Sequence, residues 1–297
     1  QRPLCIFTSG NIYCEAIRIL WITVTFSIFL FTIYRYAPHP VTIWLTLSFP
    51  GAFQNVIHGH NGFVTASILG LALLIIEKRP FSAGLILGAL SFKPHFLVII
   101  PFFLLVGRAW RTLAGLGISV FGLVLASAIC FGIESWHRFF EKIPLMLYLL
   151  KGGYLQMHQV ISTAGALLQA GVPFPAAIFI HLLCAMAGII LTALAWNKGE
   201  PYHVKYTLLV LTILLVTPYA NTYDLTLIAL PICWLGWGAY QRGRLTRLES
   251  FFLTAAWFLP LLCVVMAFHL KIQPAPLFLL SMLIWIYQDE SLKRIAA

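Results

Sequence analysis

The sequence alternates long apolar runs with short polar gaps along its length, and this pattern limits the fold more than any single motif does. About 20 helical residues cross about 30 Å of hydrocarbon. Because lipid offers no hydrogen-bond partners, a spanning backbone must satisfy its own polar groups, as helices do. The runs therefore predict an all-α polytopic membrane protein. Nine of them are expected to be ordinary crossings: 17–36, 41–57, 62–77, 112–133, 174–196, 204–220, 223–240, 250–268 and 274–288.

The composition supports this class of protein. Hydrophobic residues make up 61% of the chain and charged residues 9%, whereas about 25% of residues are charged in a typical soluble domain. A formal net charge of +10 would suggest nucleic acid binding in a soluble protein. Here Lys and Arg fall in short gaps between apolar runs, which is how membrane topology is encoded. We therefore expect membrane lipids, and no nucleic acid, as partners.

A tenth apolar stretch, 80–107, is interrupted by Lys93 and Pro94. Each half would reach only roughly 20 Å at 1.5 Å per residue, which is too short for an ordinary crossing. Proline disfavours the helical conformation at the residue before it, so the break is expected at Lys93. We predict a hairpin of two short helices and about eleven membrane-crossing segments in a single transmembrane domain, 1–297. The glycines of GLILGAL in this stretch predict close helix packing.

The basic residues predict the orientation. Twelve of the nineteen Lys and Arg residues fall on one face, which the positive-inside rule assigns to the cytoplasm: Arg35, Lys78, Arg79, Arg108, Arg111, Lys198, Lys205, Arg242, Arg244, Arg247, Lys293 and Arg294. The other seven are Arg2, Arg18, Lys93, Arg138, Lys142, Lys151 and Lys271. Both ends of the hairpin are then cytoplasmic, so its break at Lys93 points outward. The same alternation places the segments VIHGHNGF (56–63) and TPYANTYDL (217–225) on the outer side.

Polar side chains from three distant segments are thus expected to converge on the outer face of the membrane. A charge at mid-bilayer costs about 2.5–3.5 kcal/mol on insertion scales, so such groups indicate a functional site. The alternative is that each is a helix end wetted by interfacial water. The candidates are His58, His60, Asn61, Lys93, His95, Tyr219, Asn221, Tyr223 and Asp224.

The gap at 134–173 is predicted to be an external loop. Apolar side chains recur at helical spacing in WHRFFEKI, and Ser135 can cap a helix near 135–148. This helix either lies in the outer interface or packs as a loop helix without lipid contact, because both share one periodicity. The polar stretch 151–159 is of a kind that can be mobile and cover a site.

Several kinds of site can be excluded. The sequence contains no GxxxxGK[ST] phosphate loop, no HExxH motif and no glycine-rich dinucleotide signature. His58 and His60 could be two metal ligands, but a metal site usually needs three or four convergent ligands, and no carboxylate or thiol stands beside them. We expect neither a metal nor a cofactor.

Four motifs, in this order and spacing, resemble glycosyltransferase family 87, a bacterial branch of the GT-C membrane glycosyltransferases. They are FPGAFQNVIHGHNGF, GLILGALSFKPHFLVIIPFFLLVGRAWR, FGIESWHRFF and TPYANTYDL, within about residues 44–240. The resemblance implies a GT-C helix bundle. It also implies a membrane-bound hexosyltransferase that transfers a hexose, often mannose, from a polyprenyl phosphate sugar to a lipid or glycan acceptor at the outer face of the cytoplasmic membrane.

Under this resemblance the outward cluster binds the donor. Lys93 would offset the phosphate charge, His58, His60, Asn61, His95 and Asn221 would bind phosphate or sugar, and Tyr219 and Tyr223 would stack on the sugar. GT-C enzymes also carry an acidic residue in the first external loop, which has no counterpart here, so we expect the family's N-terminal part to be missing. Asp224 is then the candidate base, with Glu15 as an alternative. Two other classes stay open: a secondary transporter or flippase, and a non-catalytic scaffold.

Overall fold

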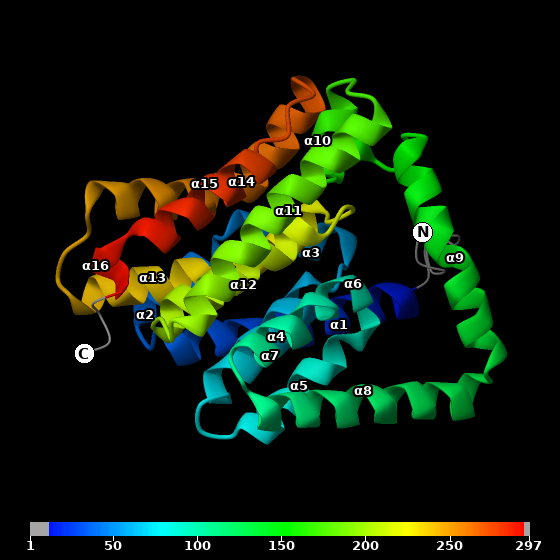
Figure 1. Cartoon of the computed structure of the whole chain (residues 1–297), viewed down its shortest axis with the longest axis horizontal. Helices are drawn as coiled ribbons and strands as arrows, with labels where there is room; N and C mark the ends of the chain where they lie inside the picture. Colours follow the sequence, from blue (N-terminus) through cyan, green and yellow to red (C-terminus); the bar gives the residue numbers. More distant parts are fainter. Residues whose placement is uncertain (1–11, 294–297) are drawn as a thin grey trace.

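The structure is a computed structural model that describes residues 12–293, and this part of the chain is all-helical with no strand (Figure 1). Arg2 and Arg294, which enter the charge count above, lie outside it. The elements are α1 (Ile12–Tyr36), α2 (Pro40–Leu47), α3 (Pro50–His58), α4 (Gly62–Ile75), α5 (Pro80–Gly88), η2 (Ala89–Phe92), α6 (Pro94–Leu97), α7 (Ile99–Val106), α8 (Trp110–Phe131), α9 (Glu134–Lys151), η3 (Met157–Gln159), α10 (Thr163–Gln169), α11 (Phe174–Asn197), α12 (Tyr202–Val216), η4 (Thr222–Ile228), α13 (Ala229–Gln241), α14 (Arg247–His269), α15 (Ala275–Gln288) and α16 (Glu290–Lys293).

The helices have the lengths and composition of a multi-pass membrane protein. Within the described residues, four helices are long and apolar enough to cross a membrane, namely α1, α8, α11 and α14. Five shorter apolar helical segments accompany them, including α4, α12 and α15. The predicted count of eleven crossings is not confirmed.

The predicted ordinary span 41–57 is wrong as a single helix, because the structure divides it into α2 and α3. Pro50 is the first residue of α3, and a proline pushes the residue before it out of the helical region. Phe49 accordingly has extended dihedrals, φ −65° and ψ 120°. The predicted span 223–240 is likewise divided, into a 3₁₀ helix, η4, and α13.

The predicted break at Lys93 is confirmed. One short helical piece, α5 with η2, ends at Phe92, and the next begins at Pro94. The predicted close packing of this stretch is also confirmed. A Cβ on Gly84 would lie 2.0 Å from a backbone oxygen of α8, and one on Gly88 would lie 2.4 Å from the Ser119 side chain of the same helix.

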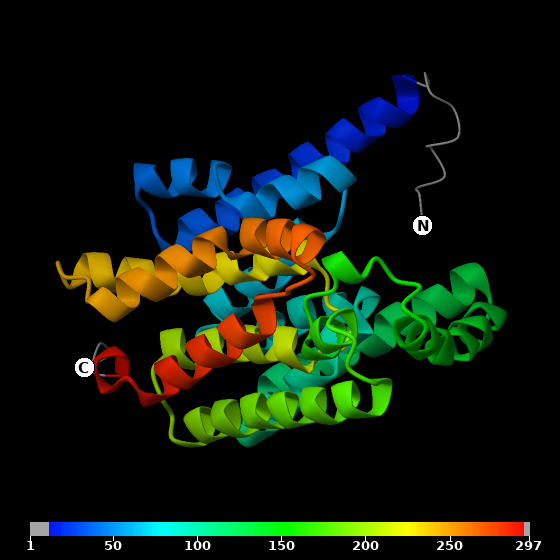
Figure 2. The same ribbon diagram turned by 90° about the horizontal axis from the view of Figure 1, so that it is seen from above.

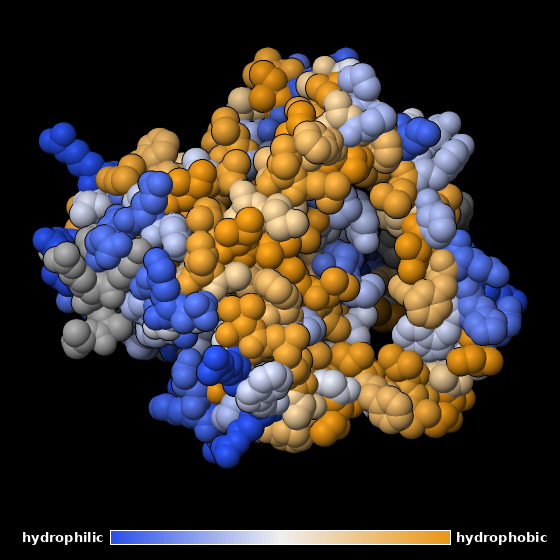
Figure 3. Space-filling view, viewed as in Figure 1, coloured by the Kyte–Doolittle hydropathy of each residue, from blue (hydrophilic) through white to orange (hydrophobic). Residues whose placement is uncertain are grey.

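The predicted external helix near 135–148 corresponds to α9, which with the end of α8 projects beside the bundle (Figure 2). Ser135 does not cap it. Its hydroxyl donates to the Gly132 carbonyl at 2.7 Å instead, one turn back along the chain. Only Leu150 of α9 is buried, and the space-filling view is hollowed between α9 and the bundle (Figure 3). The same loop contains α10, which the sequence did not predict.

Candidate functional site

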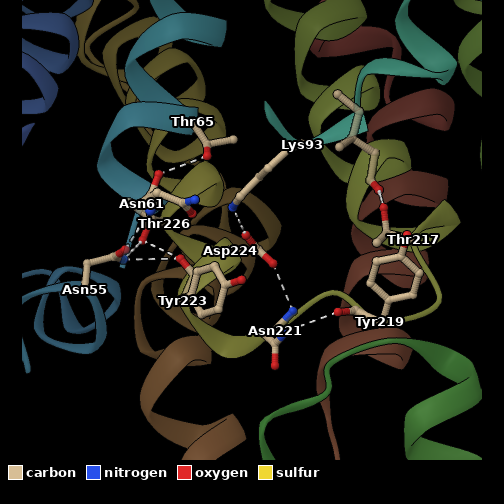
Figure 4. Close-up of polar contacts among 12 residues, drawn as sticks. Asn55, Asn61, Thr65, Lys93, Thr217, Tyr219, Asn221, Tyr223, Asp224 and Thr226 are labelled. Carbon is tan, nitrogen blue, oxygen red and sulfur yellow. Dashed lines mark hydrogen bonds and ion pairs between the residues drawn. The ribbon is translucent and has the colours of Figure 1, made fainter. Parts of the chain in front are cut away.

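A buried ion pair links the helix break to the second polar segment. Lys93 Nζ donates to Asp224 Oδ1 at 2.6 Å, and the two residues are 4% and 2% exposed (Figure 4). The proline at 94 fixes the break. On either side of the buried Lys93, Phe92 and Pro94 are exposed. Removing one member of such a pair typically costs about 3–5 kcal/mol, because the other charge stays buried. The sequence predicted these two residues on one face, and the structure brings them into contact.

The second carboxylate oxygen of Asp224 also has a partner. Asp224 Oδ2 accepts a hydrogen bond from the Asn221 backbone N–H at 3.0 Å, at the start of η4. A carboxylate is favourable there because the first N–H groups of a helix lack intrahelical acceptors. Asn221 Nδ2 donates in turn to the Tyr219 carbonyl at 3.1 Å. Both oxygens of Asp224 are therefore occupied by hydrogen bonds.

Aromatic rings surround the ammonium group. Lys93 Nζ lies 4.8 Å from the ring centroid of Tyr223 and 5.1 Å from that of Phe96. His60 stacks on Tyr223 at 4.1 Å between centroids. Cation–π contacts of this kind are worth about 0.5–2 kcal/mol and hold the ammonium in place.

The remaining predicted histidines lie at the edges of this cluster. The ring centroids of His58 and His60 are 5.4 Å apart, with His58 exposed. His95 contacts Tyr219 edge to face at 5.1 Å. Burial, followed by the repulsion of His58, lowers the pKa of His60, so the imidazole is neutral at pH 7 and keeps one donor and one acceptor.

Asn61 lies beside the ion pair, on the turn that precedes α4 (Figure 4). Its backbone carbonyl accepts from the Thr65 hydroxyl at 3.0 Å, but its side chain makes no capping bond. Among the described residues, Asn61 Oδ1 is buried without a hydrogen-bond partner. Such an atom is costly unless a ligand or water satisfies it.

The sequence analysis did not identify Asn55, which joins the two polar segments. Asn55 is fully buried, and its Nδ2 donates to Thr226 Oγ1 at 2.6 Å and to the Tyr223 carbonyl at 3.2 Å. Its Oδ1 accepts from the Gly62 backbone N–H at 2.8 Å. A Cβ on Gly62 would lie 2.4 Å from Asn55 Oδ1 and 2.6 Å from the Tyr223 carbonyl. The available signal was an amide within the predicted apolar span 41–57, although the sequence does not show that it is buried.

The segment between α9 and α11 is attached to the same site. The Ile161 backbone N–H donates to the Ala220 carbonyl at 2.8 Å, and Ser162 Oγ donates to the Pro218 carbonyl at 2.5 Å. Gln273 lies just before α15, and its Nε2 supports this strip by donating to the Val160 carbonyl at 3.3 Å. The chain that leaves the polar stretch 151–159 is thus fixed against the Asn221 turn.

The other candidate base, Glu15, lies in the first turn of α1, and its side chain is 68% exposed. Arg18 Nη1 lies 3.8 Å from its carboxylate, and Arg18 Nη2 donates to the Ile57 carbonyl at 3.2 Å. The N-terminal end of α1 is therefore at the same end of the molecule as the turn that contains His58.

Together these residues define a polar, aromatic-lined site inside an all-helical multi-pass membrane protein. The chain belongs to glycosyltransferase family 87, whose family model matches residues 5–218, well over half of the sequence. This membership is consistent with the GT-C superfamily, and it makes the protein a glycosyltransferase by family. Comparisons with curated proteins and with solved structures found no match. The family match includes Lys93 and the histidines and ends before Asn221 and Asp224.

Proposed function

We propose that this chain transfers a hexose, mannose being the first candidate, from a polyprenyl phosphate sugar to a lipid or glycan acceptor. The reaction takes place at the outer face of the cytoplasmic membrane. The observation that carries the proposal is the buried pair of Lys93 and Asp224 at an interrupted helix, enclosed by aromatic rings. A polyprenyl donor keeps its lipid in the bilayer and brings its phosphate to such a break, as substrates do at broken helices in other membrane proteins.

Lys93 can bind the phosphate while it stays paired. An ammonium group has three N–H donors, and among the described residues only Asp224 takes one as a hydrogen-bond acceptor. The other two can bind phosphate oxygens. As the bond between C1 of the sugar and the phosphate oxygen breaks, its electron pair passes to the phosphate. A fixed cation stabilises the charge that develops there, and so it stabilises the transition state more than the ground state.

The rings and polar groups suit a sugar above the phosphate. Tyr223 and Tyr219 offer apolar faces, and the imidazole groups of His60 and His95 can hydrogen-bond to hydroxyl groups. The unpartnered Asn61 Oδ1 is an acceptor for a sugar hydroxyl. These roles support a hexose donor and do not select among hexoses.

The acceptor hydroxyl must lose its proton as its oxygen bonds to C1. The contacts of Asp224 argue against the hypothesis that it is the base, since both of its carboxylate oxygens already accept hydrogen bonds. Those contacts support a positioning role, in which Asp224 orients Lys93. Neutral His60, half-buried beside Tyr223, is an alternative proton acceptor.

The test is transfer of radiolabelled mannose from polyprenyl phosphate mannose in membranes that express the full gene product. Lys93→Ala and His60→Ala should abolish or strongly reduce transfer. Lys142→Ala on α9 and His269→Ala at the end of α14 are matched controls at exposed positions outside the four motifs and should transfer at the parent rate. Asp224→Asn separates the two roles: loss of turnover with donor affinity retained supports a base, whereas loss of donor affinity as well supports positioning of Lys93.

No transfer from mannose or other hexose donors by a well-expressed parent protein would refute the proposal. Counter-flow uptake in proteoliposomes would then support the transporter instead.

A further inference from the structure

A polar pocket lies at the other ends of the helices that carry the Lys93 site. It has a volume of about 590 Å³ and is lined by the ends of α4 and α7 and the starts of α8 and α12. Of these helices, α4 and α12 each run from one site to the other. The 15 residues of α12 separate the two sites by about 22 Å at 1.5 Å per residue. The pocket therefore faces the opposite membrane surface, which the basic residues assign to the cytoplasm.

The pocket carries an excess of positive charge. Arg108, Arg111 and Lys205 line it, against one carboxylate, Glu77. Glu77 Oε1 accepts a hydrogen bond from the buried Tyr206 hydroxyl at 3.0 Å. Among residues 12–293, no ion pair includes any of the three basic side chains. Their charge is available to an anion.

Two tryptophans place the pocket at interfacial depth. Trp110 is 62% exposed, and Trp196 forms one wall. A Cβ on Gly107 would lie 2.8 Å from the Trp196 ring, so the chain passes directly against it. Lys205 Nζ lies 5.9 Å from the centroid of the same ring. Tryptophan is enriched where a membrane protein meets the lipid headgroups.

Two further features are unusual for a simple helix connection. Arg108 has a φ of 53°, a left-handed conformation that favours glycine, although it follows Gly107 directly. Thr112, which also lines the pocket, is 0% exposed, and its hydroxyl has no hydrogen-bond partner within the described part of the chain. A strained arginine and an unsatisfied hydroxyl beside unpaired charge indicate a ligand.

We propose that this pocket binds the phosphate headgroup of an anionic phospholipid from the leaflet opposite the Lys93 site. Two guanidinium groups can bind a phosphodiester through paired N–H donors. Basic pockets between helices at the cytoplasmic surface are suited to anionic headgroups. The exposed ring of Trp110 gives the pocket an apolar border that can take the acyl chains. Free phosphate shares the headgroup chemistry but has no use for this apolar border.

The proposal is tested on the protein purified in a neutral detergent. Its unfolding temperature is titrated with phosphatidylglycerol, phosphatidylcholine or sodium phosphate, and retained lipid is counted by native mass spectrometry. Phosphatidylglycerol should stabilise the parent. With about a fivefold loss of affinity per basic residue, its affinity should fall about twenty-fivefold in R108Q/R111Q and about fivefold in Lys205→Gln. Arg244→Gln, an exposed arginine on the same face outside this pocket, should match the parent.

Equal phosphatidylglycerol affinity in the parent and R108Q/R111Q would overturn the proposal, and so would equal protection by phosphatidylcholine. Protection by sodium phosphate alone, with no retained lipid, would show a free-phosphate site and overturn the assignment to a lipid. If R108Q/R111Q does not fold, the single variant Lys205→Gln decides by the same readouts. None of these measurements depends on the transfer reaction.

Discussion

Replacing Lys93 and Asp224 singly and together separates the structural role of the ion pair from its chemical role. Lys93→Met leaves a buried carboxylate without its cation, and Asp224→Leu leaves a buried ammonium without its anion. Each should lower the free energy of unfolding by about 3–5 kcal/mol. In the double variant no charge remains, and apolar side chains of similar size replace the pair. Its stability should return to within about 2 kcal/mol of the parent, since replacing a buried pair by apolar side chains is often neutral. The remaining cost of about 1–2 kcal/mol arises because the Asn221 N–H loses its acceptor, Asp224 Oδ2.

The expected change in unfolding temperature follows from chain length. An unfolding entropy of about 2.1 cal/mol/K per residue gives about 0.6 kcal/mol/K for this chain. Each single variant should then unfold roughly 5–8 °C below the parent. A thiol-reactive dye can report unfolding, because Cys233 and Cys263 are 9% and 0% exposed and react when the bundle opens.

The activity assay completes the design. The double variant should be folded and inactive in mannose transfer, because it lacks the ammonium that is proposed to bind the phosphate. A double variant as unstable as the sum of the two single variants would refute the reasoning, since it would show that the residues act independently. So would single variants that unfold at the parent temperature. A stable double variant that still transfers sugar would remove Lys93 from the proposed chemistry.

Three further predictions concern the turn around the site. Gly62→Ala should prevent folding or strongly destabilise the protein, because its Cβ would lie 2.6 Å from the Tyr223 carbonyl oxygen. Gly117→Ala is the control, because its Cβ would meet nothing within 4 Å. In the same dye assay this variant should be as stable as the parent or slightly more stable. Asn55→Ala leaves the Gly62 N–H without its acceptor and should lower the unfolding temperature by roughly 2–5 °C, and an unchanged temperature would contradict the network. His60 has a pKa below its ordinary value of about 6.5, so it is neutral at pH 7. The transfer rate should therefore fall only when the pH is lowered far enough to protonate it. A transfer rate that already falls as the pH is lowered from 8 to 7 would exclude this group.

The sequence predicted those parts of the site that local chemistry determines. The break at Lys93 follows from a proline after a polar residue in an apolar run. The outward face that the basic residues at the hairpin ends indicate stays a prediction. The same proline rule applies to Phe49 and Pro50. The predicted span 41–57 ran through them as one helix, and the structure breaks the helix there. Proline alone does not decide the matter, because Pro144 and Pro260 lie inside continuous helices. Tertiary packing determines which prolines interrupt a helix.

The contacts between distant segments could not be predicted from periodicity. Asn55 and Thr226 are 171 positions apart, and nothing in either apolar run indicates that one amide would satisfy groups on both. The sequence assigns Lys93 and Asp224 to the same face of the membrane, but it does not predict that the two side chains are in contact. A charge count assigns residues to a membrane surface and contains no information about which of them touch.

The depth of the site follows from differences in helix length. At 1.5 Å per residue, α4 with 14 residues and α12 with 15 reach about 21 and 22 Å, short of about 30 Å of hydrocarbon. In contrast α8, with 22 residues, and α11, with 24, reach about 33 and 36 Å. The long helices lead into and out of the segment that contains α9, whereas the short ones end at the turns that carry Asn61 and Asn221. The short helices thus reach roughly 10–15 Å less than the long ones, and a hollow lies between α9 and the bundle (Figure 3). We therefore expect the Lys93–Asp224 pair to lie below the level of the adjacent headgroups, within protein rather than in lipid.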